Sequence, residues 1–544
     1  MKIALAQLNY HIGNFKSNME LILKEVNSAK TAGADLIIFA ELAICGYPPK
    51  DFLEFESFIS DCENAIYEIA EACHGIAAII GAPSKSKLKR GKRLHNSAYF
   101  LANGVVQSVH HKTLLPTYDV FDENRYFESA KEHDLIEYKG KTIAITICED
   151  LWNIEGDMKY STSPTELLDL KRADFMVNIA ASPFSYQQQK ERQKVLSWNA
   201  KKYQLPIFYV NHIGAQTELI FDGGSCVVNK LGELCAELAY FESETVVFDI
   251  ENLPSAHQLQ EKLKIEKMYH ALVLGVRDYF VKSNFSKAII GLSGGIDSAL
   301  TLAIAVEALG KENVKSVLLP SKYSSDHSIN DSIELCKNLD SPYETISIEE
   351  VVKSFNLSLS NSFQGLKEDV TEENIQARAR GVILMAMSNK FGNILLNTSN
   401  KSEMAVGYGT LYGDMCGGLS VIGDVYKTEV FEMCRFINRN KEIIPESIIT
   451  KPPSAELRPD QKDSDSLPDY KVLDAILFQY IECSKSGNKI INQGFEEDTV
   501  KRSIQLVNRN EYKRYQAAPI LRVSPRAFGM GRLMPLVGEY TFNN

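Results

Sequence analysis

One short stretch of the sequence combines the residue types of a phosphate-binding loop. Residues 289–300 read IIGLSGGIDSAL, in which one apolar run enters a glycine turn and another leaves it. Adjacent glycines let backbone N–H groups approach an anion closely, and a following helix adds its positive end. The stretch lacks lysine, whereas the usual nucleoside-triphosphate loop carries Gly-Lys-Ser/Thr. The alternative interpretation is a glycine turn that only packs a strand on a helix.

Asp297 makes this loop unusual. A carboxylate beside phosphates is repulsive unless a metal ion lies between them, so Asp297 is a candidate Mg²⁺ ligand. Ser293 and Ser298 can donate hydroxyl hydrogen bonds. Such a loop holds a departing pyrophosphate and leaves the α-phosphate open to attack. The stretch therefore favours adenylyl transfer from ATP over γ-phosphoryl transfer.

Three residues of the amino-terminal half form a second candidate site. Cys148 ends the apolar run TIAITIC, Glu41 lies at the end of LIIFAEL, and Lys112 follows VVQSVHH. A thiol with a pKa of about 8.5 needs a base or a positive charge to become a good nucleophile. We expect Glu41 to take the thiol proton and later to protonate departing ammonia, Lys112 to stabilise the oxyanion, and Cys148 to carry the acyl group. Taken singly, each residue is more often a salt bridge, a surface charge or a packed thiol.

The elements that must position these residues differ between the two halves of the chain. Up to about residue 250, β-rich apolar runs recur, with helical patterns such as 18–31 and 57–73 between several of them. The predicted strands are 3–8, 36–42, 76–80, 105–109, 142–148, 175–179, 207–210, 226–228 and 245–250. Residues 253–264 turn polar and read as a linker between a domain of residues 1–252 and one of residues 265–544.

The second domain shows regular alternation of strands and helices, which indicates a parallel sheet with crossover helices. The predicted strands are 288–292, 314–319, 345–348 and 393–397, and the predicted helices are 298–309, 329–338 and 373–390. Ligands collect at the carboxyl ends of strands in such sheets. We therefore expect residues 293–298 at an outward-facing edge.

The composition of the 544-residue chain excludes several classes of protein. A net charge of −11 argues against a general nucleic-acid binder, because such binding needs clustered Lys and Arg. The 10 cysteines include no Cys-x-x-Cys pair that would indicate zinc or a redox dithiol. No run of about 18 apolar residues predicts a membrane helix, and the first residues do not look like a signal peptide. We expect a cytoplasmic protein with no membrane partner.

The motifs of both halves resemble a known family. SGGIDS resembles the loop of ATP pyrophosphatases, and six further segments resemble NAD synthetase across residues 262–544. They are LPSKYSSDHS, EENIQARARG, NTSNKSEMAVGYGTLYGDMCGG, DVYKTEVF, PSAELRPDQKDSDSLPDY and NEYKRYQAAP. FAELAICGYPPKD, HHKTLLPTYDVFDENRYF and TICEDLW resemble the nitrilase-type glutaminase domain found fused to that synthetase. The resemblance implies an α/β protein, with a nitrilase-like αββα sandwich followed by a Rossmann-like, parallel-sheet ATP-pyrophosphatase domain.

The resemblance also implies roles for single residues. It assigns the glutamine site to Tyr118, Ser182 and Gln188, although the family often has Gly-Lys where this chain has Gln187-Gln188. It assigns the metal to Asp297 and Glu403. It assigns ATP to Gly291, Leu292, Ser293, Gly294, Gly295, Ile296, Asp297, Ser298 and Thr398. It assigns deamido-NAD to Asn374, Glu403, Tyr408, Gly409, Thr410, Leu411 and Lys513.

The implied reaction is the amidation of deamido-NAD by a ligase. ATP adenylates the nicotinate carboxylate, and ammonia from glutamine displaces AMP, with Mg²⁺ as cofactor and a homo-oligomer built on a synthetase-domain dimer. The acidic segment 460–465 is an ordinary loop or a lid over ATP. One alternative is another glutamine-dependent ligase with the same loop, although Lys2 excludes the amino-terminal cysteine of asparagine synthetase. Others are a nucleotide sensor with a decayed catalytic domain and an amidase with a regulatory nucleotide module.

Overall fold

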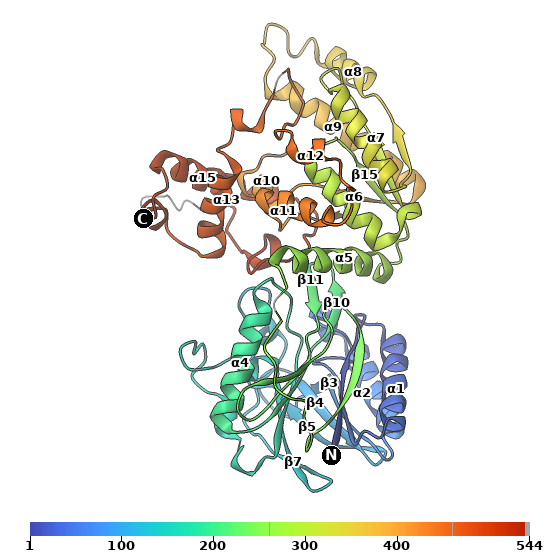
Figure 1. The fold of residues 1–544 in the computed structure, drawn as a ribbon, viewed down its shortest axis with the longest axis vertical. Coiled ribbons are helices and arrows are strands. Elements are labelled where there is room, and N and C mark those ends of the chain that lie inside the picture. The colour runs from blue at the N-terminus through green and yellow to red at the C-terminus, as the bar shows by residue number, and fades with distance from the viewer. Residues whose placement is uncertain (169, 261, 460, 539–544) are drawn as a thin grey trace. The chain divides into compact units, whose positions relative to one another are not determined.

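The computed structural model describes residues 1–168, 170–260, 262–459 and 461–538. The chain divides into two compact units between residues 261 and 262 (Figure 1). This division falls inside the segment 253–264, whose polar composition predicts a linker. Across the described residues, no helix has both the length and the apolar character that a membrane span requires.

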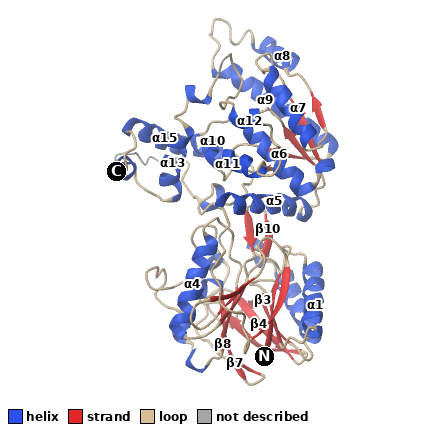
Figure 2. Ribbon diagram, viewed as in Figure 1, coloured by secondary structure: helices blue, strands red, loops and turns tan. Residues whose placement is uncertain are grey.

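The first unit is built on two mixed sheets (Figure 2). The first has the order β14-β1-β2-β3-β4-β5: β1 Lys2–Gln7, β2 Leu36–Ile38, β3 Ala77–Lys85, β4 Leu94–Ala102, β5 Val105–His111 and β14 Glu244–Asp249. The second has the order β13-β12-β9-β8-β7-β6: β6 Ile136–Tyr138, β7 Lys141–Ile147, β8 Phe175–Ile179, β9 Ile207–Val210, β12 Cys226–Val228 and β13 Leu234–Glu237. A separate hairpin joins β10 Ile213–Gln216 to β11 Leu219–Asp222.

Helices cover the outer faces of these two sheets. Helices α1 (Phe15–Thr31) and α2 (Glu56–Ala72) pack on the first sheet, and α4 (Gln188–Tyr203) packs on the second. A short α3 spans Pro164–Leu167. The strands β3 and β4 are buried almost throughout because both of their faces are covered. This arrangement confirms the predicted αββα sandwich.

Parallel strands bring the predicted catalytic residues to one region of the first unit. β1, β2 and β3 run parallel, and so do β7, β8 and β9. Glu41 follows β2, Cys148 follows β7, and Ser182 follows β8. The predicted strands 36–42 and 142–148 both end earlier than expected, at Ile38 and Ile147, so Glu41 and Cys148 lie in turns.

The second unit contains a parallel sheet with the order β17-β16-β15-β18-β19. Its strands are β15 Ala288–Gly291, β16 Val314–Leu318, β17 Tyr343–Thr345, β18 Ile394–Asn397 and β19 Leu419–Ser420. Its longer helices are α5 Lys264–Lys282, α6 Ile296–Leu309, α7 Asp326–Asn338, α8 Glu349–Leu359, α9 Val370–Phe391, α11 Lys427–Ile437, α13 Tyr470–Leu477 and α15 Glu497–Arg509. The shorter ones are α10 Lys401–Val406, α12 Glu446–Thr450, α14 Gly487–Ile491 and α16 Glu511–Arg514. The predicted Rossmann-like sheet is confirmed.

Candidate active sites

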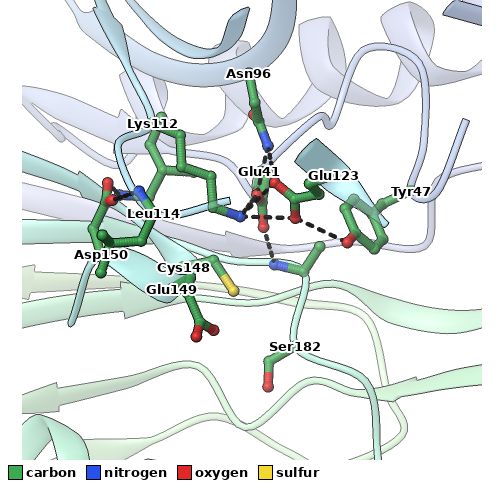
Figure 3. Close-up of polar contacts among 12 residues, drawn as sticks. Glu41, Tyr47, Asn96, Lys112, Leu114, Glu123, Cys148, Glu149, Asp150 and Ser182 are labelled. Atoms are coloured by element: carbon green, nitrogen blue, oxygen red, sulfur yellow. Dashed lines mark hydrogen bonds and ion pairs between the residues drawn. The ribbon is translucent and has the colours of Figure 1, made fainter. Parts of the chain in front are cut away.

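A buried ion pair joins two of the three predicted glutaminase residues. Lys112 Nζ donates to Glu41 Oε1 at 2.6 Å, and both side chains are fully buried (Figure 3). The other carboxylate oxygen of Glu41 accepts from the backbone N–H of Ala181 at 2.9 Å. Each oxygen of Glu41 therefore has a donor, which fixes the orientation of the carboxylate beside Cys148.

Cys148 begins the turn that follows β7, in a left-handed backbone conformation with φ 43°. Figure 3 shows its sulfur on the side that faces Lys112 and Ser182. Burial raises the pKa of the Cys148 thiol well above its ordinary value; the charge of Glu41 raises it further, and Lys112 partly opposes the shift. The resting thiol is therefore protonated at neutral pH. Its activation requires transfer of the proton to a neighbouring base.

Three residues of this site were missed by the sequence analysis. Glu123 accepts from Lys112 Nζ at 2.8 Å through each oxygen, Asn96 Nδ2 donates to Glu41 at 2.7 Å, and Tyr47 OH donates to Glu123 at 2.9 Å. Burial alone would lower the pKa of Lys112, but the charges of Glu123 and Glu41 hold it well above its usual range. Lys112 is therefore a permanent cation. Glu123 and Tyr47 both lie within motifs of the family resemblance, which was the available signal.

The predicted glutamine residues make hydrogen bonds with one another or with Glu149, the residue after Cys148. Tyr118 OH donates to the Glu149 carboxylate at 2.8 Å, and Gln188 Nε2 donates to Ser182 Oγ at 3.0 Å. The backbone N–H of Ser182 donates to Asn211 Oδ1 at 2.8 Å. The structure thus brings Ser182 and Gln188 into direct contact and ties Tyr118 to the residue after the nucleophile.

The pair Gly223-Gly224 lies directly after the hairpin of β10 and β11. The hairpin closes between β10 and β11, and the two glycines follow β11. Arg192 Nη1 donates to the carbonyl of Gly223 at 2.5 Å, and Arg192 Nη2 donates to Asp222 at 2.8 Å. Asn211 Nδ2 also donates to the Gly223 carbonyl, at 3.0 Å. The glycine pair therefore connects α4 with the backbone that carries Ser182.

The glycine loop of the second unit borders a cavity of about 320 Å³. Seven of the eight predicted loop residues line it, as does Thr398: Gly291, Leu292, Ser293, Gly295, Ile296, Asp297 and Ser298. Gly294 has φ +77°, and a Cβ there would lie 2.3 Å from the carbonyl oxygen of Ser328. Glycine is therefore required at position 294 by both conformation and space. Helix α6 begins at Ile296, so its amino-terminal end faces the cavity.

Asp297 and Glu403, the predicted metal ligands, both line the cavity and share one cationic neighbour. Lys427 Nζ donates to Asp297 at 2.5 Å and to Glu403 at 3.5 Å. Burial and the charge of Asp297 raise the pKa of Glu403 to about 8, although Lys427 opposes the shift. Magnesium is commonly held by one or two carboxylates together with substrate phosphates. The two carboxylates fit such a site, since both line the cavity that the glycine loop borders.

The predicted dinucleotide residues form a network beside this cavity. Glu403 and Tyr408 line the cavity itself, and Tyr408 OH donates to Asp463 at 3.2 Å. Thr410 Oγ1 donates to Asn374 Oδ1 at 2.7 Å. Lys513 Nζ donates to the carbonyls of Gly407 and Gly409, at 2.8 and 2.7 Å.

The other five predicted dinucleotide residues do not line the cavity: Asn374, Gly409, Thr410, Leu411 and Lys513. Leu411 accepts from Arg378 Nε through its carbonyl at 3.2 Å. Within the predicted acidic loop 460–465, Asp463 lines the cavity, and residue 460 lies outside the described residues.

Comparisons with known proteins identify both units. A carbon-nitrogen hydrolase family model matches residues 2–254, and an NAD synthase model matches residues 268–517. A carbon-nitrogen hydrolase unit and an NAD synthase unit in one chain, together with the relatives given next, place the protein in the class of ligases that form carbon–nitrogen bonds. The chain belongs to the family of glutamine-dependent NAD(+) synthetases.

The similarity to this family extends from end to end. The chain is 48% identical to the glutamine-dependent NAD(+) synthetase of Synechocystis sp., with 99% of each chain covered. It is 43% identical to that of Acinetobacter baylyi, with 99% of this chain and 98% of the relative covered. A solved structure of the Acinetobacter baumannii synthetase in complex with ADP is 40% identical, with a TM-score of 0.78 and 100% and 99% coverage. A Cytophaga hutchinsonii synthetase structure shares the fold, with a TM-score of 0.84 at 22% identity and 99% and 98% coverage.

Proposed function

We propose that the enzyme divides the ATP-dependent amidation of deamido-NAD between its two units. The first unit hydrolyses glutamine to glutamate and ammonia. The second adenylates the nicotinate carboxylate and exchanges AMP for ammonia, which yields NAD, AMP and pyrophosphate. The observation that carries the proposal is the ion pair between Glu41 and Lys112 beside Cys148, because those residues come from three separate parts of the chain.

In the first unit, Glu41 acts as general base and then as general acid. It takes the proton of Cys148 as the sulfur attacks the amide carbon of glutamine, and it returns that proton to the departing ammonia. Lys112 donates a hydrogen bond to the oxyanion of the tetrahedral intermediate. Water then attacks the thioester, glutamate leaves, and the thiol is restored. Tyr118, Ser182 and Gln188 hold the substrate.

In the second unit, the loop 291–298 holds the triphosphate. Ser293 and Ser298 donate hydroxyl hydrogen bonds to it, and the helix that starts at Ile296 adds its positive end. The nicotinate carboxylate attacks the α-phosphorus, and pyrophosphate leaves. Ammonia then attacks the carboxyl carbon of the acyl adenylate, and AMP leaves. Thr398 contacts ATP.

The dinucleotide lies against residues around the turn 408–411. This set comprises Asn374, Glu403, Tyr408, Gly409, Thr410, Leu411 and Lys513. Asp297 and Glu403 would hold Mg²⁺, which supplies positive charge next to the phosphates. The resemblance also supports a homo-oligomer built on a dimer of synthetase units and a cytoplasmic location.

Product analysis with two nitrogen donors tests this division of labour. The full chain is incubated with ATP, deamido-NAD and either glutamine or ammonium, and NAD, AMP and pyrophosphate are quantified. The variant Cys148→Ala should lose glutamine-dependent synthesis and keep ammonium-dependent synthesis. The matched control is Cys73→Ala, because Cys73 is a fully buried cysteine at the carboxyl end of α2. This variant should keep both glutamine-dependent and ammonium-dependent synthesis. Loss of both activities in Cys148→Ala, or formation of ADP and orthophosphate, would contradict the proposal.

A further inference from the structure

The proposed glutamine site lacks a cation among its assigned contacts. Tyr118, Ser182 and Gln188 are all uncharged, whereas free glutamine carries a carboxylate and an ammonium on one carbon. The amide of Gln188 already donates to Ser182 at 3.0 Å. A carboxylate bound without a positive partner loses hydration that neutral groups replace only in part. The site therefore needs a cation from another part of the first unit.

Two cations of the first unit are committed to other partners. Lys112 is fully buried between Glu41 and Glu123. Arg192 is 3% exposed at its side chain and pairs with Asp222 at 2.8 Å. Neither can turn toward a substrate carboxylate without leaving a buried carboxylate uncompensated.

Lys159 is a third cation, and it lies directly over the proposed site. Its Nζ is 4.3 Å from the centre of the Tyr118 ring. Within the described residues it makes one ion pair, a long one of 3.9 Å with Asp157. Its side chain is 40% exposed, so the ammonium remains hydrated and can approach a ligand at little cost. A substrate group that binds against the Tyr118 ring would therefore lie close to the Lys159 ammonium.

Hydrogen bonds of Tyr160 hold the chain next to Lys159 in place. Asn153 bonds both backbone groups of Tyr160, accepting from its N–H at 3.2 Å and donating to its carbonyl at 3.1 Å. Tyr160 OH donates to Glu149 at 3.1 Å, the same carboxylate that accepts from Tyr118. These contacts tie Tyr160, the residue next to Lys159, to the same carboxylate that holds Tyr118.

We propose that Lys159 binds the α-carboxylate of glutamine and is a specificity-determining residue of the glutaminase reaction. The proposal rests on the glutamine site proposed above. Glu149, 3% exposed and joined to Tyr118, supplies the neighbouring negative charge. The ammonium over the Tyr118 ring and the carboxylate at the Tyr118 hydroxyl match the opposite charges on the α-carbon of the substrate. Lys159 thereby supplies the charge that Gln188 does not.

A glutamine analogue that lacks the α-carboxylate tests the role of Lys159. The comparison uses Lys159→Met, the charge-retaining Lys159→Arg, and the surface control Lys171→Met. The donors are L-glutamine and 4-aminobutanamide, which has the same amide and ammonium but no carboxylate. Ammonia release and NAD formation are followed with the full chain in the presence of ATP and deamido-NAD.

Lys159→Met should raise the KM for glutamine about tenfold, the loss expected for one partly exposed charged hydrogen bond. Its kcat should change little, because Lys159 does not touch the reacting amide. The kcat/KM for 4-aminobutanamide should match that of the parent enzyme, and Lys159→Arg should restore most of the affinity for glutamine. Lys171→Met should behave as the parent enzyme with both donors.

Two results would overturn the assignment of Lys159. One is an unchanged KM for glutamine in Lys159→Met, and the other is an equal loss with glutamine and 4-aminobutanamide. A failure of the underlying function is separately visible. In that case the parent enzyme itself would make NAD from ammonium and not from glutamine, whatever residue stands at position 159.

Discussion

The ammonium group of Lys427 lies 2.5 Å from the carboxylate of Asp297. It also reaches Glu403 at 3.5 Å, so one buried cation serves both carboxylates that are predicted to bind Mg²⁺. The side chain of Lys427 is 3% exposed. A buried carboxylate that loses its positive partner is strongly unfavourable. Lys427 thus compensates the pair in the absence of a metal.

Replacement of Lys427 by methionine should make stability depend on magnesium. Without metal we expect the free energy of unfolding to fall by about 1–2 kcal/mol, less than for a fully buried pair, because the side chains of Asp297 and Glu403 are 17% and 18% exposed. Because a metal that binds only the folded state stabilises it, magnesium should raise the melting temperature of Lys427→Met more than that of the parent enzyme. Lys451→Met, which removes a lysine at the same cavity that pairs with Asp331, is the control. Equal magnesium shifts in the parent enzyme and Lys427→Met would refute this expectation.

Substitution of the two adjacent glycines of the phosphate loop by alanine should have different effects on stability. Gly294→Ala places a Cβ 2.3 Å from the Ser328 carbonyl oxygen at φ +77°, whereas Gly295→Ala meets only the Ser293 hydroxyl at 3.2 Å. The left-handed backbone alone costs about 1–2 kcal/mol for a residue with a Cβ, and the clash adds to it. Gly294→Ala should therefore lower the free energy of unfolding in urea by more than about 2 kcal/mol. Gly295→Ala should lower it by less than about 1 kcal/mol, and a reversed order would refute the geometry.

Alkylation should report the raised pKa of Cys148. A free thiol reacts faster with iodoacetamide as the pH passes about 8.5, because the thiolate is the nucleophile. Burial holds the pKa of Cys148 above that value. In the folded enzyme without glutamine, the alkylation rate of Cys148 should therefore not increase across this pH range. Mass spectrometry of the peptide that contains Cys148 measures the rate. The urea-unfolded chain is the control, and in it the alkylation rate of Cys148 should rise with pH as for a free thiol. The same rise in the folded enzyme would contradict the raised pKa of Cys148.

The ion pair between Arg192 and Asp222 should stabilise the glutamine site through the backbone. Both side chains are almost fully buried, so Arg192→Met should destabilise the protein by about 3–5 kcal/mol in urea unfolding. The double variant Arg192→Met/Asp222→Leu should lose less, because no buried carboxylate is then left unpaired. Since the Gly223 carbonyl accepts from both Arg192 and Asn211, the KM for glutamine should also rise in Arg192→Met. A single variant as stable as the double one would show that the pair contributes little.

The fold class was predictable because the sheet strands of the second unit are apolar runs bounded by turns. The strands β15, β16 and β18 lie within the predicted ranges 288–292, 314–319 and 393–397. The strand β4 was missed, since its sequence LHNSAYFLA has three consecutive polar residues at 95–97. One of these polar residues is Asn96, whose side chain donates to Glu41 in the proposed glutaminase site. The local pattern failed where a strand carries a functional side chain.

The sequence by itself determined which residue types could do chemistry: a thiol, a carboxylate and an amine at strand ends, and a glycine loop with Asp297 in place of lysine. These signals are local, because strand ends and glycine turns are encoded by neighbouring residues. Only the tertiary structure decided that Glu123 shares the Lys112 ammonium, that Lys427 compensates Asp297 and Glu403, and that Lys159 lies over Tyr118. Such partners meet through the packing of segments far apart in the chain. Charge compensation between them depends on distance in space, which residue spacing does not specify.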